Sequence, residues 1–298
     1  MATERYEVIL QRLDTALNRC SDLGLGEMVN NSRFSQYRRW LEKLIGIVRK
    51  TGPTGINHEL RDEILKHKAE YLASLVESME FGEVMQHLSQ MDRDVLSSKL
   101  VDVLQGPFLP RGENATSNKS RNTLFELNLA ALLKRAGFSP ELPPHPDVRC
   151  CVAQTPLFFE CKRPFSGKKV EKRIKEAGKQ LENDIRDCGT ADTYGVVAIS
   201  FAKLFSPSQI PIPILNEQIA RQFMDSWLMD VAERTKNAWG RFQQSSAIGC
   251  ILFHLRGIFE NAANGRFDVG QWWLGVQFPG PKGLFVKDLS RALTALTD

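Results

Sequence analysis

Residues 146–162 read PDVRCCVAQTPLFFECK and are the most informative stretch of the chain. Two short runs rich in apolar and β-branched residues, Val148–Ala153 and Leu157–Lys162, are separated by a turn signal at 154–156. This pattern predicts two short strands joined as a hairpin.

Three charged side chains are placed to meet on this hairpin. Glu160 and Lys162 lie two residues apart on a strand, so they project from one face. Asp147 begins the neighbouring strand. Hard cations such as Mg²⁺ prefer oxygen ligands, which Asp147, Glu160 and the backbone carbonyl of Cys161 would supply. Such an ion would polarise a phosphate and activate a water, and Lys162 would stabilise developing negative charge.

The surrounding elements predict an α/β domain. A helix over 121–136 precedes the hairpin and a helix over 168–187 follows it, each with an apolar stripe. Beyond them, the pattern predicts strands at 194–201, 247–255 and 271–278, and helices at 213–238 and about 286–296. Helices alternating with strands in this order are typical of a mixed β-sheet flanked by helices.

The first part of the chain has a different pattern. Residues 1–105 show helical periodicity almost throughout, with a Gly/Pro break at 52–55, and predict a helical bundle or cap domain. Residues 106–120 are rich in Gly, Pro and polar side chains and are expected to form a linker or exposed loop. The α/β domain is therefore expected over 121–298.

The order Asp147, Glu160, Lys162 resembles the PD-(D/E)XK nuclease superfamily, over roughly residues 120–200 and less clearly to 280. Glu126 lies on the helix before the hairpin, where the family often has a further acidic residue. Gln180 lies on the helix after it, where some branches have a glutamine. One such branch also has a tyrosine four residues later, and Asp184 stands at that position here.

The resemblance implies a restriction-endonuclease-like fold and a nuclease that needs Mg²⁺, with Mn²⁺ able to substitute. It implies catalytic roles for Asp147, Glu160, Lys162, Glu126 and Gln180, and adds Glu126 to the metal ligands. Restriction, phage defence, repair and mobile-element processing all use this chemistry, and many such enzymes act as dimers.

A basic stretch follows the hairpin. Between Lys162 and Lys179 there are eight Lys or Arg and two Glu, a local charge of +6 in a chain of net charge +4. Lys168, Lys172, Lys175 and Lys179 have the spacing of one helical face, and with Arg163 they are candidates for contacting a nucleic-acid backbone. A solvated helix face is the alternative.

Other features exclude or weaken competing functions. The charged start of the chain and the lack of a long apolar run predict a cytoplasmic protein without a membrane span. Cys150, Cys151 and Cys161 with His145 could hold a metal, although buried thiols explain them as well. His254 is expected to be a core histidine. Ser200 has no histidine near it in sequence, which gives no support to a serine hydrolase.

Three functions remain open. The first is a metal-dependent endonuclease, with DNA favoured over RNA. The second is a catalytically silent nucleic-acid-binding or assembly protein on the same fold, in which the N-terminal helices bind a protein partner or form a homodimer. The third is an unrelated α/β enzyme in which the motif arose by chance.

Overall fold

The structure is a computed structural model that describes residues 6–51, 62–63, 65–114, 117–152, 154–189, 192–205, 212–214, 216–261, 267–279 and 289. The chain divides into two compact units. Unit 1 comprises Met1–Leu124, Ser206–Ala220 and Gly257–Gly270, and unit 2 comprises Phe125–Phe205, Arg221–Arg256 and Gln271–Asp298.

Unit 1 is built mainly from helices. They are α1 (Tyr6–Cys20), the π-helical turn η1 (Ser21–Leu25), α2 (Gly26–Asn31), α3 (Arg33–Thr51), α5 (Lys68–Leu88) and α6 (Arg93–Leu104). Helices α1, α3 and α5 pack against one another. Apolar residues at helical spacing are buried along these contacts, and the rings of Phe34 and Phe81 stack with centroids 4.2 Å apart. The expected N-terminal helical region is therefore present.

A buried ionic network lies inside unit 1. The Glu77 carboxylate accepts hydrogen bonds from Arg33 Nε at 2.7 Å, Arg121 Nε at 2.6 Å and the Tyr37 hydroxyl at 3.0 Å. Arg121 also donates to Glu113 at 3.3 Å. Both oxygens of the carboxylate are thus bonded and its charge is compensated, as the burial of a charge requires.

The mixed sheet follows the helical region. Its strands are β1 (Val148–Val152), β2 (Thr155–Lys162), β3 (Tyr194–Ser200), β4 (Ile212–Ile214), β5 (Ile248–Asn261) and β6 (Phe267–Gln277). They are ordered β1-β2-β3-β5-β4, and β6 also pairs with β5. The β1–β2 pair is antiparallel, whereas β2–β3, β3–β5 and β4–β5 are parallel. Strand β3 is buried on both faces, as expected for a central parallel strand.

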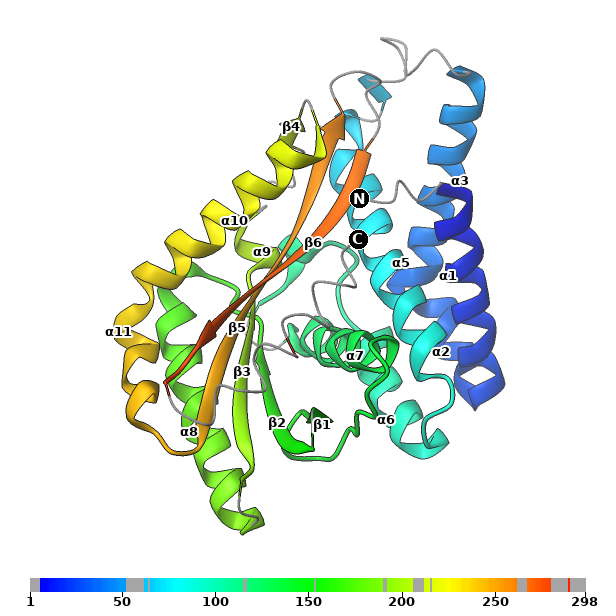
Figure 1. Cartoon of the computed structure of the whole chain (residues 1–298). Coiled ribbons are helices and arrows are strands. Elements are labelled where there is room, and N and C mark those ends of the chain that lie inside the picture. The colour runs from blue at the N-terminus through cyan, green and yellow to red at the C-terminus, as the bar shows by residue number, and fades with distance from the viewer. Residues whose placement is uncertain are drawn as a thin grey trace. The chain divides into compact units, whose positions relative to one another are not determined.

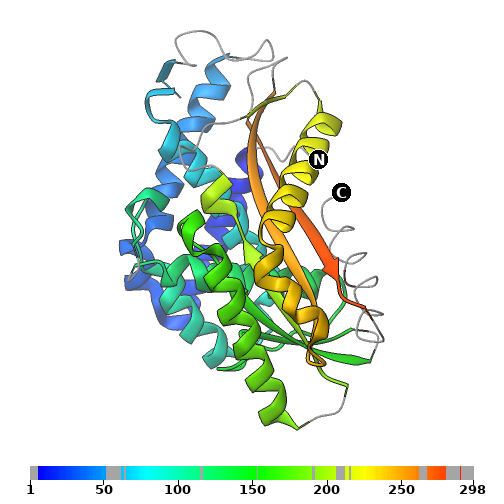
Figure 2. The same cartoon turned by 90° about the vertical axis from the view of Figure 1, so that its left-hand side faces the viewer.

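Helices cover the sheet in unit 2. Helix α7 (Lys119–Arg135) precedes β1, and α8 (Val170–Cys188) packs on β2 and β3 (Figure 1). Short helix α11 (Lys236–Trp239) follows α10 (Glu217–Arg234) and packs beside α8, as Figure 2 shows. A Cβ at Gly178 would overlap the ring of Phe242, so a glycine allows this close approach.

Most predicted elements are confirmed with small shifts at their ends. The helix expected over 213–238 is divided, because β4 occupies 212–214 and Thr235 separates α10 from α11. Segment 106–120 is exposed only in part, since Arg111, Gly112 and Asn114 are exposed whereas Leu109, Glu113 and Ser120 are buried. The break at 52–55 and most of the helix expected at 286–296 lie outside the described residues.

Candidate active site

The hairpin brings the predicted triad together at the start of β1 and the end of β2. Val148 pairs with Phe159, so the register continued by one residue sets Asp147 opposite Glu160. Asp147 Oδ2 accepts a hydrogen bond from the Cys161 backbone N–H at 2.7 Å, which ties the carboxylate to the partner strand. Lys162 Nζ donates to Glu160 Oε1. The three side chains therefore lie at one place, as the sequence predicted.

Glu160 is the most perturbed acid of this cluster. Its side chain is only 1% exposed, and burial, followed by the negative charge of Asp147, raises its pKa to about 8 against the opposing effect of Lys162. Within the described residues, Glu160 Oε2 has no hydrogen-bond partner. A buried carboxyl oxygen without a donor is costly and is the kind of feature that collects at functional sites.

Lys162 is the cation of the cluster. Its side chain is 21% exposed, so it reaches the surface while its neighbour Glu160 does not. Burial lowers the pKa of Lys162, but the carboxylates of Glu160 and Asp147 more than offset this and hold its pKa above the ordinary value. One ammonium group therefore faces more than one carboxylate.

Asp184 is the residue that the sequence interpretation missed. It lies on α8, and its charge raises the pKa of Glu160, while burial and the charge of Asp147 contribute to raising its own pKa. Its Oδ2 is buried without a hydrogen-bond partner among the described residues. The sequence could have indicated that Asp184 lies near the triad. Asp184 follows Gln180 by four residues, which sets both on the same face of a helix next to β2.

Glu126 and Gln180 are less closely tied to the triad. Glu126, on α7, is half-buried, and its charge helps to raise the pKa of the Cys161 thiol after burial and Asp147. Cys161 points to the face of β2 opposite to Glu160. Gln180 is half-buried on α8, and its side chain makes no hydrogen bond within the described residues. Neither residue takes part in the hydrogen bonds that tie Asp147 and Glu160 into the cluster.

The expected metal-ligand sets are only partly assembled. Within the residues that the structure describes, no three His, Cys, Asp or Glu side chains are grouped so that they could hold one ion. Glu126 therefore does not complete a three-carboxylate set with Asp147 and Glu160. The cysteine alternative is not supported either, because Cys150 and Cys161 are buried free thiols and Cys151 is exposed.

The predicted basic face is solvent-exposed. Lys172, Lys175 and Lys179 lie exposed along α8, while Lys168 lies in the short 3-10 turn η4 (Gly167–Lys169) just before it. Lys172 lies 3.7 Å from Glu176, and Lys175 lies 3.7 Å from Glu171. Arg163, directly after β2, is half-buried. Exposed ion pairs of this kind contribute little to stability.

Ser200 does have a histidine neighbour, which corrects the sequence interpretation. Parallel pairing sets Ser200 on β3 beside His254 on β5, and Oγ lies 2.9 Å from Nδ1. Both side chains are buried. Phe125 stacks on the imidazole, and Trp273 packs against it in a tilted arrangement. Burial and nearby arginines lower the pKa of His254 well below its ordinary value. This histidine is a neutral core residue, as expected.

Comparison with protein-family models, curated proteins and solved structures finds no match to this chain. No helix in the described part of the chain is both long and apolar enough to cross a membrane.

Proposed function

We propose that this chain is a metal-dependent nuclease that hydrolyses phosphodiester bonds, with DNA as the favoured substrate. The observation that carries the proposal is the β1–β2 register, which sets Asp147 against Glu160 and Lys162 where the strands end. This hairpin, with α7 before it and α8 after it, supports a restriction-endonuclease-like arrangement.

The residues of the cluster fit a divalent cation. Asp147 and Glu160 offer hard oxygen ligands, and Glu160 Oε2 is buried with no donor among the described residues. Lys162 alone does not keep Glu160 ionised at neutral pH, because the pKa of Glu160 is still raised to about 8. A positive ion beside these groups would favour the ionised carboxylate. Asp147, Glu160 and the Cys161 carbonyl would hold Mg²⁺ or Mn²⁺, which when bound polarises phosphate and acidifies water.

The chain's own groups have distinct roles in this proposal. Lys162, partly exposed beside Glu160, is positioned to contact a non-bridging phosphate oxygen and to stabilise negative charge there. Asp147 is held in place by the Cys161 N–H, so it orients the cluster. The exposed lysines of α8 supply a surface for the phosphate backbone.

The test is cleavage of plasmid, linear duplex, single-stranded DNA and RNA with Mg²⁺, Mn²⁺ or EDTA. Wild type should cut at least one substrate only with metal, and Lys162→Ala and Asp147→Asn should lose about 100-fold or more in rate. Lys236→Ala is the matched control, because Lys236 is an exposed lysine of unit 2 paired with Glu233. Equal rates for wild type and Lys162→Ala would overturn the proposal.

The binding surface has a separate test. Lys172→Glu and Lys175→Glu should each weaken nucleic-acid binding and reduce the salt dependence of the logarithm of the binding constant by about one unit. Nucleic-acid binding that depends on these lysines, in a protein that neither binds Mn²⁺ nor cuts, would instead establish the catalytically silent alternative.

A further inference from the structure

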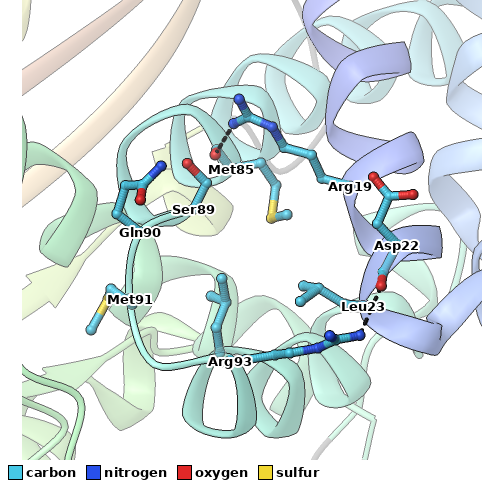
Figure 3. A pocket seen from close by; sticks show the side chains of 9 residues that line it. Arg19, Asp22, Leu23, Met85, Ser89, Gln90, Met91 and Arg93 are labelled. Atoms are coloured by element: carbon cyan, nitrogen blue, oxygen red, sulfur yellow. Dashed lines mark hydrogen bonds between the residues drawn. The ribbon is translucent and has the colours of Figure 1, made fainter.

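A hollow of about 390 Å³ opens in unit 1 between the end of α1, the turn η1, the end of α5 and the start of α6 (Figure 3). Its volume lies within the range of small-molecule pockets. Two of its lining side chains, Met85 and Leu96, are only 1% and 2% exposed, so the hollow reaches the apolar interior of the helices.

Two arginines flank this pocket. Arg19 Nη1 donates to the Met85 carbonyl at 2.7 Å, and Arg93 Nη2 donates to the Asp22 carbonyl at 2.8 Å. Figure 3 shows Arg19 and Arg93 on different sides of the hollow, each held by its dashed bond. These bonds restrict the long side chains before any ligand arrives, which lowers the entropic cost of binding.

The irregular turn η1 supplies one of the two backbone carbonyls that hold these arginines. Gly24 has φ +89°, a left-handed conformation that interrupts regular helix geometry between α1 and α2. Here the Asp22 carbonyl in this turn accepts from Arg93 and so holds that guanidinium at the pocket edge.

The pocket has an excess of positive charge. Arg19 and Arg93 are its two cationic lining residues, and Asp22 supplies one carboxylate. Within the described residues, neither guanidinium forms an ion pair with a carboxylate. A guanidinium has five N–H donors, so each arginine keeps donors free after its bond to a backbone carbonyl.

We propose that this pocket binds a small amphipathic anion, whose carboxylate, sulfonate or phosphate group lies between Arg19 and Arg93. The apolar body of the ligand packs on Met85, Leu96 and Leu23, which line the hollow. Planar guanidinium groups are the preferred partners of such anions, and the apolar body of the ligand leaves water when it lies in the hollow. The inference is independent of the proposed nuclease activity.

Two fluorescent probes with the same ring system test this inference on the full chain. 8-Anilino-1-naphthalenesulfonate carries an anionic group, and N-phenyl-1-naphthylamine does not. Wild type should bind the sulfonate at one site, about tenfold more tightly than the neutral amine. Arg93→Gln and Arg19→Gln should each remove about this tenfold preference and leave the affinity for the neutral probe unchanged.

Two further variants complete the experiment. Arg49→Gln is the matched control, because Arg49 is a highly exposed arginine of the same unit, 4.0 Å from Glu7, and should bind both probes as wild type does. Ser89→Trp fills the pocket and should abolish binding of both probes. Equal affinity of wild type for the two probes, or sulfonate binding unchanged in Arg93→Gln and Ser89→Trp with helicity intact, would overturn the inference.

Discussion

Glu77 and Glu160 are both buried glutamates, but their surroundings shift their pKa values in opposite directions. Burial raises the pKa of Glu77, yet Arg121 and Arg33 outweigh it and the net pKa is lowered. Glu160 faces one lysine together with the like charges of Asp147 and Asp184, and its pKa is raised to about 8. Burial alone therefore does not decide the direction of the pKa shift of a glutamate, because the neighbouring charges can outweigh it.

The hydrogen-bond partners of the two glutamates show the same contrast. Both oxygens of Glu77 accept from charged or hydroxyl donors, whereas Glu160 Oε2 has none among the described residues. The first arrangement holds helices α3, α5 and α7 in a fixed geometry. The second is costly, and under the proposed function a bound cation would offset that cost.

Neutralising Glu77 should have the largest effect. Glu77→Gln leaves the guanidiniums of Arg33 and Arg121 buried without their shared carboxylate, and we expect a loss of about 3–5 kcal/mol in the free energy of unfolding. Urea denaturation at neutral pH measures it. The same change at Glu160 should cause no such loss, and equal destabilisation by both variants would break the comparison.

The second-largest effect should be a difference between Glu160 and Glu77 in how their contributions to stability depend on pH. The folded pKa of Glu160, about 8, lies above its ordinary value of 4.5. Its contribution to stability is therefore complete below about pH 4.5 and is lost as the pH rises through 8. Glu77 has a lowered pKa, so its contribution is present above pH 4.5 and is lost as the pH falls through its folded pKa.

The measurement for this contrast is urea denaturation between pH 5 and 9 with chelator present. Relative to wild type, Glu160→Gln should gain about 2–4 kcal/mol of stability at the alkaline end, because an amide cannot ionise. At the acidic end the two proteins should be nearly equal. A difference that does not change with pH would show that Glu160 is not a buried acid of raised pKa.

A smaller effect is expected from the hydroxyl of Tyr37. Tyr37→Phe removes a hydroxyl that bonds to Glu77 and the Phe108 carbonyl and accepts from Arg121, and this should cost about 1 kcal/mol. Tyr71→Phe is the matched control, because the Tyr71 hydroxyl is buried without a hydrogen-bond partner in the described part of the chain. Its removal should be neutral or slightly stabilising. The reverse order in thermal melting would contradict the hydrogen-bond assignment in unit 1.

The smallest effect concerns the two acids beside Glu160. Asp147→Asn should lower the pKa of Glu160 clearly, and Asp184→Asn should lower it less, since the charge of Asp147 has the larger influence. Carboxyl carbon chemical shifts followed by NMR through a pH titration measure both. If Asp184→Asn has no effect on Glu160, Asp184 does not belong to the cluster.

The triad was readable from the sequence because strand geometry is local. A spacing of two sets Glu160 and Lys162 on one face, and a short turn fixes which residue of the first strand lies opposite. The role of Asp184 depends on how α8 packs on β2, and the Ser200–His254 contact depends on the parallel pairing of β3 with β5. These are long-range arrangements, which local patterns do not specify.

Long-range contacts also account for the buried residues within segment 106–120. Its Gly, Pro and polar residues are typical of an exposed loop. In the structure, Glu113 and Ser120 accept hydrogen bonds from arginines of the ionic network. These polar side chains can be buried because a buried charged group bonds to them. Composition alone could not show that Arg33 and Arg121 would be inside.

The most direct test of the proposed cation site at Asp147 and Glu160 is a titration of the full chain with Mn²⁺, in which bound ions are counted by electron paramagnetic resonance. The account predicts saturable binding that is lost in Asp147→Asn and Glu160→Gln and retained in Asp14→Asn, where an exposed carboxylate paired with Arg38 is removed instead. Mn²⁺ binding that is absent from wild type, or equally strong in all four proteins, would contradict it.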